Sequence, residues 1–146
     1  MEYRIQKLQK LLDKGKAYID NTSENLLSKK KEGKWSKKEI LGHLIDSGIN
    51  NLQRFTEIQF KEKPYHIENY NQDQLVLANQ YQHASKEALT SLWLGLNQRI
   101  IAIIKQQTVE TLNFQIVIEQ KVKTDLKFLI EDYVDHLEHH LRQILK

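Results

Sequence analysis

Three of the six histidines lie in one short motif near the end of the chain, D-H-L-E-H-H-L at residues 135–141. In a helix, positions i and i+4 project from the same face about one turn apart, so His136 and His140 are placed to bind one metal ion together. His139 is offset from His140 by about 100° around such a helix and falls outside this pair. The motif therefore predicts two ligands of a metal site that needs a third.

His43 is the candidate for the third ligand. It lies beside the apolar stripe of an earlier predicted helix, and steps of three and four residues from it follow a polar ribbon. If this ribbon faces a similar one on the last helix, three imidazoles meet and leave metal positions open to water or substrate. Alternatively, the ribbon faces solvent and His43 is an ordinary surface histidine. The first ribbon comprises Asp46, Ser47, Asn50 and Arg54, and the second Asp132, His136, His139 or His140, and Gln143.

Asp46 is the candidate carboxylate for this site, three residues beyond His43. It has two possible roles, because a carboxylate there accepts a proton from a metal-activated water or orients an imidazole through a hydrogen bond. A zinc-protease site is excluded. In H-E-x-x-H the glutamate directly follows the first histidine, whereas here Leu137 holds that place.

Hydrophobic periodicity predicts four helices that position these residues. They cover about residues 2–20, 36 to 59 or 60, 71–105 and 125–145. The second opens with an S-x-x-E capping box formed by Ser36 and Glu39. Residues 21–34 are predicted to be a loop with room for one short helical turn at Leu26 and Leu27.

Two further connections join the predicted helices. Residues 61–70 contain the only proline and show no period, which indicates a loop with exposed aromatic rings. Between residues 108 and 124, apolar side chains alternate at Phe114, Ile116 and Ile118, which predicts a short strand or an extended connection. The arrangement favours a four-helix bundle with a long crossover before the last helix.

The composition agrees with one all-α domain over residues 1–146. Hydrophobic residues make up 40% of the chain, and five glycines and one proline are too few for a sandwich of many short strands. The chain has no cysteine, which excludes disulfides, a thiolate metal site and a cysteine nucleophile. Any sulfur chemistry must therefore use a borrowed thiol.

Charge and hydropathy indicate where the protein acts. The formal net charge of +3 is mild for a nucleic-acid binder, and no nucleic-acid partner is expected. The lysines at positions 29, 30, 31, 34, 37 and 38 lie before and into one helix start, where phosphate contact is one interpretation. A solvated loop is the expected one, because no aromatic stacking platform accompanies them. The charged N-terminus and the lack of a long apolar run favour a cytoplasmic protein without a membrane association.

Two motifs resemble signatures of the DinB-like, or YfiT-like, superfamily of four-helix metalloproteins. The run W-S-K-K-E-I-L-G-H-L-I-D-S at residues 35–47, followed by Arg54 and Phe55, is similar to the first signature. Residues 132–144 resemble the closing H-x-x-H-H pattern, whose first and last histidines are ligands. Residues 70–74 and 93–97 look like the family's central helix, so the resemblance covers nearly the whole chain.

The resemblance implies that His43, His136 and His140 bind a divalent ion, typically nickel or zinc, within an up-down-down-up bundle. Homodimers are common in the family, so a homodimer is a further expectation. Members include proteins assigned as metal-dependent hydrolases from their triple-histidine sites. Others transfer low-molecular-weight thiols such as bacillithiol or mycothiol, and one of these is a maleylpyruvate isomerase. The motifs identify the metal site and leave the reaction open.

Two enzymatic uses of such a site follow from metal chemistry. A bound thiol loses its proton and becomes a thiolate nucleophile, and a bound water becomes hydroxide. The absence of cysteine fits the first use, so we expect a bacillithiol-type S-transferase that acts on a small-molecule substrate. The alternatives are a metal-dependent hydrolase and a non-catalytic, stress-linked metal-binding module. Arg54, about three turns beyond His43, is the candidate contact for an anionic tail of the thiol, and the loop at residues 64–70 is expected to frame the path of the electrophile.

Overall fold

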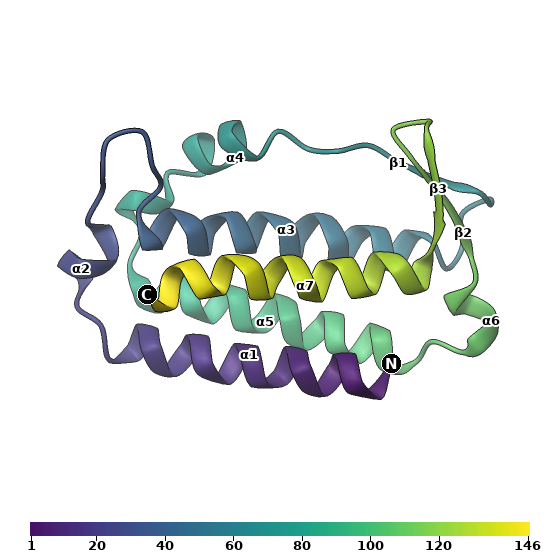
Figure 1. Cartoon of the computed structure of the whole chain (residues 1–146), viewed down its shortest axis with the longest axis horizontal. Helices are drawn as coiled ribbons and strands as arrows, with labels where there is room; N and C mark the ends of the chain where they lie inside the picture. Colours follow the sequence, from purple (N-terminus) through teal and green to yellow (C-terminus); the bar gives the residue numbers. More distant parts are fainter.

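Four long helices dominate the structure, a computed structural model that describes residues 1–146 throughout. They are α1 (Glu2–Asp20), α3 (Lys37–Glu57), α5 (Lys86–Lys105) and α7 (Leu126–Leu145). Figure 1 shows α3 and α5 running in one direction and α1 and α7 in the other. Both α3 and α1 pack against α5 and α7. The predicted all-α class and the up-down-down-up bundle are therefore confirmed, with a small sheet added.

Two long connections join the bundle helices. Residues 106–125 form the long connection predicted before the last helix, and they carry α6 (Val109–Leu112), β2 (Gln115–Ile118) and β3 (Val122–Asp125). This connection turns at one end of the bundle (Figure 1). The crossover that runs back along the bundle is residues 58–85, one connection earlier than predicted, because α5 points the same way as α3.

The long helix predicted over residues 71–105 is interrupted in the structure. It consists of α4 (Gln72–Asn79), a short 3-10 helix η1 (Tyr81–His83) and α5. Gln80 adopts a left-handed conformation with φ of 49°, and the Ser85 side chain caps α5 by accepting from the Ala88 N–H. The break places the buried Tyr81 ring against α3 while α5 packs deeper in the bundle. Periodicity alone does not show it, because apolar residues continue at helical spacing on both sides.

The other local predictions match more closely. The capping box at the start of α3 is present, since Ser36 Oγ accepts from the Glu39 N–H at 3.1 Å and Glu39 Oε1 accepts from the Ser36 N–H at 3.0 Å. The α3 helix ends at Glu57, two or three residues before the predicted end. The short helical turn at Leu26 and Leu27 is confirmed as α2 (Glu24–Ser28).

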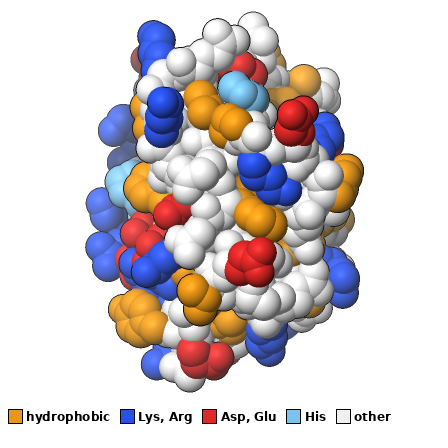
Figure 2. All heavy atoms as spheres, turned by 90° about the vertical axis from the view of Figure 1, so that its right-hand side faces the viewer, with side chains coloured by type: hydrophobic (Ala, Val, Ile, Leu, Met, Phe, Trp, Pro, Cys, Tyr) orange, Lys and Arg blue, Asp and Glu red, His pale blue; other side chains and the backbone are white.

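A three-stranded sheet closes one end of the bundle. The order is β1-β2-β3, with β1 (Tyr65–Ile67) parallel to β2 and β2 antiparallel to β3. The predicted strand near Ile116 is confirmed, whereas residues 61–70 are only partly the predicted loop because β1 lies within them. Figure 2 shows this end of the molecule, where acidic, basic and hydrophobic side chains are interspersed.

One hydrophobic cluster of 29 buried residues fills the space between the four long helices. Trp93 is fully buried and lies against Gly15 of α1, where a Cβ atom would be 2.5 Å from the indole. This contact explains a glycine in the middle of a predicted helix. None of the helices combines the length and apolar character needed to cross a bilayer.

Candidate metal centre

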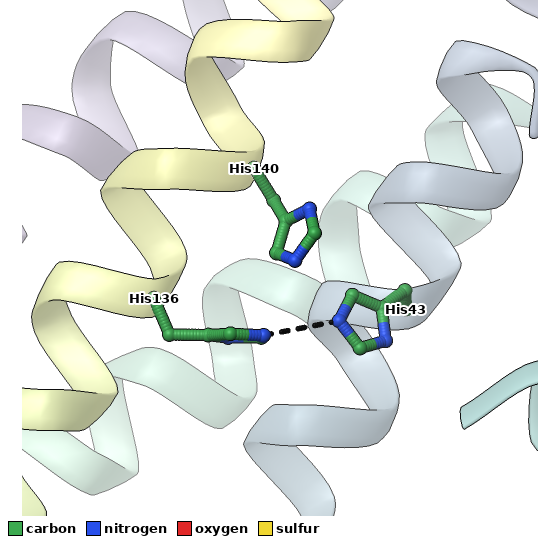
Figure 3. A group of neighbouring side chains, drawn as sticks. All are labelled: His43, His136 and His140. Carbon is green, nitrogen blue, oxygen red and sulfur yellow. Dashed lines mark hydrogen bonds between the residues drawn. The ribbon is translucent and has the colours of Figure 1, made fainter. Parts of the chain in front are cut away.

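Three histidines from two helices meet between α3 and α7 (Figure 3). His43 comes from α3, and His136 and His140 lie one turn apart on α7. One ligand nitrogen from each lies within 4.8 Å of the others, and Nε2 of His43 is 3.1 Å from Nε2 of His136. His43 is fully buried and Asp46 nearly so, which excludes the interpretation of the α3 ribbon as a solvent face.

Aromatic rings pack against His43 and against the α3 backbone beside it. The indole ring of Trp35 lies 5.1 Å from the imidazole, measured between ring centroids. On the neighbouring residue, Gly42, a Cβ atom would lie 2.0 Å from the Tyr81 ring, so this ring sits directly on the α3 backbone. Nδ1 of His43 is buried and has no hydrogen-bond partner. The ring of His43 is therefore oriented by Trp35 and by the contact of its Nε2 with His136, and its Nδ1 makes no hydrogen bond.

The electrostatic setting keeps the three imidazoles neutral at pH 7. Burial, and then the neighbouring His140 and His136, lower the pKa of His43 to about 4. Burial, and then the neighbouring His140 and His139, lower the pKa of His136 to about 4. The pKa of His140 is also lowered, chiefly by burial. Neutral imidazoles present the nitrogen lone pairs that a metal ion needs.

The donor set fits a divalent ion. Imidazole nitrogen binds zinc at about 2.0–2.1 Å, so two ligand atoms of a tetrahedral site are about 3.3 Å apart. The separation of 3.1 Å between the Nε2 atoms of His43 and His136 is close to that value. Imidazole is a suitable ligand for both nickel and zinc. Three such ligands leave positions for water or substrate.

Gln143 orients His140, a contact for which sequence analysis offered no role. Its side-chain Oε1 lies 3.0 Å from Nδ1 of His140. A carboxamide oxygen only accepts, so Nδ1 carries the proton and Nε2 keeps its lone pair. The sequence signal for this contact is the spacing of three residues, which puts the side chains of His140 and Gln143 on one face of α7.

Replacing Gln143 by alanine is expected to weaken zinc or nickel binding about 10-fold, because a hydrogen bond to a ligating histidine fixes its tautomer and orientation. Gln143→Glu retains an acceptor oxygen and is expected to bind the metal at least as tightly as wild type. Competition with a chromophoric chelator measures both affinities. Equal affinities for wild type and Gln143→Ala would show that the contact does not orient His140.

Asp46 does not contact the histidines in this structure. Its Oδ1 accepts a hydrogen bond from the Tyr81 hydroxyl at 2.5 Å and another from the Asn79 side chain at 3.0 Å, while Oδ2 is buried without a partner. Burial raises the pKa of this carboxyl group. The hydrogen bonds of Asp46 thus come from the end of α4 and from η1, which they hold against α3, and none comes from an imidazole.

A cavity of about 330 Å³ adjoins the cluster, with His136 in its wall. Arg54 also lines this cavity and is half-buried. The guanidinium donates to the backbone oxygen of Glu68 at 2.6 Å, lies over the ring of Tyr70 and forms no ion pair with a carboxylate. Asp132 is the carboxylate in the cavity wall, and partial burial together with the charge of Asp135 raises its pKa.

The remaining histidines lie outside the cluster. His139 is exposed, and its ring centroid lies 4.9 Å from that of His140. His66 is exposed on β1 and His83 is exposed on η1. The three histidines whose ligand atoms lie close together are therefore the predicted ones, and His139 is not among them.

The profile of the DinB superfamily matches residues 7–144. The chain belongs to the DinB superfamily. In this DinB protein the two matched signatures supply the residues that meet between α3 and α7. The sequence matches none of the curated proteins.

Solved structures share the DinB fold over almost the whole chain. YfiT from Bacillus subtilis, described as a probable metal-dependent hydrolase with an unusual four-helix bundle topology, matches with a TM-score of 0.87 at 23% identity, covering 98% of this chain and 82% of YfiT. A mycothiol-dependent maleylpyruvate isomerase matches with a TM-score of 0.74 at 11% identity, over 98% of this chain and 60% of the isomerase. The chain thus spans about three fifths of the isomerase. At these identities the likeness shows the fold.

Proposed function

We propose that this protein is a metal-dependent S-transferase that uses a low-molecular-weight thiol of the bacillithiol type. The observation that carries the proposal is one cavity whose wall contains both His136, a member of the cluster of three imidazoles, and an arginine that forms no ion pair with an acidic side chain. A nickel or zinc ion held by His43, His136 and His140 would lower the pKa of a bound thiol and so supply a sulfur nucleophile. The chain has no cysteine, so the sulfur arrives with the co-substrate.

The cavity wall suits a thiol with a polar, anionic tail. Arg54 lies eleven residues beyond His43 on α3, or about 16 Å along the helix axis, which is the reach of an extended small molecule. Its guanidinium offers a charge-assisted hydrogen bond to a carboxylate. Hydroxyl and carboxamide groups between the two ends suit a hydroxylated or peptide-like body. These groups come from Ser47, Asn51, Asn69, Tyr70 and Gln72.

The proposed reaction balances without a further reactant. The thiol sulfur forms a bond to an electrophilic carbon of the small-molecule substrate, and the leaving group departs with the bonding electrons. The thiol proton passes to the leaving group or to solvent. The raised pKa of Asp132, in the wall beside His136, suits this carboxyl group to hold that proton during transfer.

Hydrolysis is the second candidate, and the position of Asp132 is the observation that favours it. A hydrolase needs a carboxylate beside the attacking water. Asp132 lines the same cavity as His136, whereas Asp46 is hydrogen-bonded to Tyr81 and Asn79 and does not line the cavity. YfiT, with the same fold, is described as a probable metal-dependent hydrolase. In this candidate reaction Asp132, rather than Asp46, accepts the proton of water.

The deciding experiment supplies bacillithiol and 1-chloro-2,4-dinitrobenzene to zinc- or nickel-loaded protein, chelated protein and the His136→Ala variant. Thiol-dependent formation of the thioether is expected for the loaded wild type and is expected to be lost in the other two. Turnover of esters or amides without any thiol would assign hydrolysis instead. Metal binding without either activity would leave a non-catalytic metal-binding module.

Arg54→Gln tests the tail contact within the same assay. We expect the KM for bacillithiol to rise about 10-fold or more at an unchanged kcat, because a hydrogen bond to a charged group contributes about 1.5–3 kcal/mol. The matched control is 2-mercaptoethanol, which has no anionic tail, and its KM should be the same for both proteins. An equal rise in KM for both thiols would contradict a tail contact.

A further inference from the structure

Five of the six lysines that cluster in the sequence divide into two sets in the structure, and the sixth, Lys37, donates hydrogen bonds to the Tyr18 hydroxyl and to the backbone oxygen of Lys146. Lys38 is only 4% exposed and pairs with Glu24 at 2.6 Å, so the prediction of a solvated loop is wrong for this residue. Lys30 pairs with Glu39 at 2.7 Å. The second set is exposed and forms no ion pair with an acidic side chain; it comprises Lys29, Lys31 and Lys34.

This second set surrounds a hollow between the start of α3 and the end of α7. Two adjoining parts of the hollow, of about 410 and 310 Å³, share Trp35 and Ile40 as apolar lining. No aspartate or glutamate lines either part. This purely basic set of charged side chains contrasts with the other end of the bundle, where acidic and basic side chains are interspersed (Figure 2). The basic lining consists of Lys29, Lys31, Lys34, Lys37 and Lys146.

The hollow contacts the histidine cluster through two of its lining residues. The Trp35 ring lies 5.1 Å from that of His43, and Gln143 accepts the hydrogen bond from His140. On both helices the cluster lies between this hollow and the cavity of Arg54. On α3, the residues that line the hollow come before His43 and those that line the cavity come after it. On α7, the residues that line the cavity come first and those that line the hollow come last. A ligand in each would approach the cluster from opposite sides.

We propose that the hollow binds a small organic anion with an apolar, preferably aromatic, body. The indole of Trp35 offers a face for stacking, and Ile40 adds apolar contact. One exposed ion pair contributes little to affinity, so binding depends on several lysines acting together with the apolar lining. In the S-transfer reaction proposed above, on which this role rests, the anion is the electrophilic partner of the thiol.

NMR of 15N-labelled, metal-free protein tests the binding directly. The chain has two tryptophans, and the fully buried Trp93 is an internal reference for Trp35. Phenyl phosphate is expected to shift the indole N–H signal of Trp35 in a saturable way and to leave that of Trp93 in place. Inorganic phosphate has the negative charge without an aromatic ring, and benzyl alcohol has the ring without the charge. Both should bind at least about tenfold more weakly than phenyl phosphate, a difference of about 1.4 kcal/mol.

Charge variants identify the site. The double variant Lys31→Gln, Lys34→Gln is expected to weaken phenyl phosphate binding at least about tenfold. Lys127→Gln, an exposed lysine near the other end of α7, should bind like wild type. An unmoved Trp35 signal, or unchanged affinity in the double variant, would overturn the proposal. Since the protein is metal-free, the outcome is independent of S-transferase activity, and binding without turnover would disprove only the catalytic role.

Discussion

Alanine at His43, His136 or His140 is expected to abolish stoichiometric binding of nickel or zinc. Each imidazole supplies one of three nitrogens that lie within 4.8 Å of one another. A residue that merely orients a ligating histidine changes affinity 10–100-fold, so loss of a ligand should cost more than about 100-fold. Elemental analysis of the purified variants gives the occupancy, and calorimetry with added zinc gives the affinity.

His139→Ala is the matched control for the three ligand variants. His139 is exposed and next to His140, yet its ring does not belong to the group that gathers around one point. This variant should keep full metal occupancy. The ligand assignment would be wrong if His139→Ala lost the metal while His43→Ala and His140→Ala retained it.

Gly42→Leu is expected to lower the free energy of unfolding by about 3 kcal/mol, the upper end of the usual cost of overpacking. A Cβ atom at this position would lie 2.0 Å from Cδ2 of Tyr81. The ring has little freedom to move away, because its hydroxyl donates to the buried carboxylate of Asp46. Urea denaturation followed by circular dichroism measures the change.

Gly95→Ala provides the control, since it also places a side chain on a helical glycine. No atom lies within 4 Å of a Cβ at Gly95, so this variant should gain about 0.5–1 kcal/mol from the lower flexibility of the unfolded chain. Opposite signs for the two variants would attribute the loss at Gly42 to its contact with Tyr81. If Gly42→Leu unfolds at the same urea concentration as wild type, that contact is not tight.

The parts of the fold that could be predicted from the sequence rest on short-range signals. The start of α3 depends on Ser36 and Glu39, which are three residues apart and interact directly. The strand β1 has no such signal, because its stabilising partner is β2, where Tyr65 pairs with Ile116. The break before α5 combines both kinds of signal, since Ser85 caps α5 locally whereas Tyr81 packs on Gly42 of the distant α3.

In the candidate site, too, the residues that could be predicted are those related by a short-range signal. His136 and His140 are visible as a pair because one turn of one helix separates them. Periodicity could not decide whether His43 faces them, since α3 is buried on nearly every side between residues 41 and 48, and the choice of His43 rested on the family resemblance. Proximity in the sequence made Asp46 the candidate carboxylate, but its hydrogen bond to Tyr81 could not be predicted, because Tyr81 lies in a segment predicted as the interior of a long helix.

Because α3 and α5 run in the same direction, the chain cannot assemble this bundle from consecutive helical hairpins. Residues 58–85 must first span the length of the bundle before α5 reaches α3. The contact between His43 and His136 joins residues 93 positions apart. Across two-state proteins, folding slows as the mean sequence separation of contacts rises. This bundle is therefore expected to reach its native state more slowly than an up-and-down bundle of equal length, with the meeting of α3 and α7 as a late step.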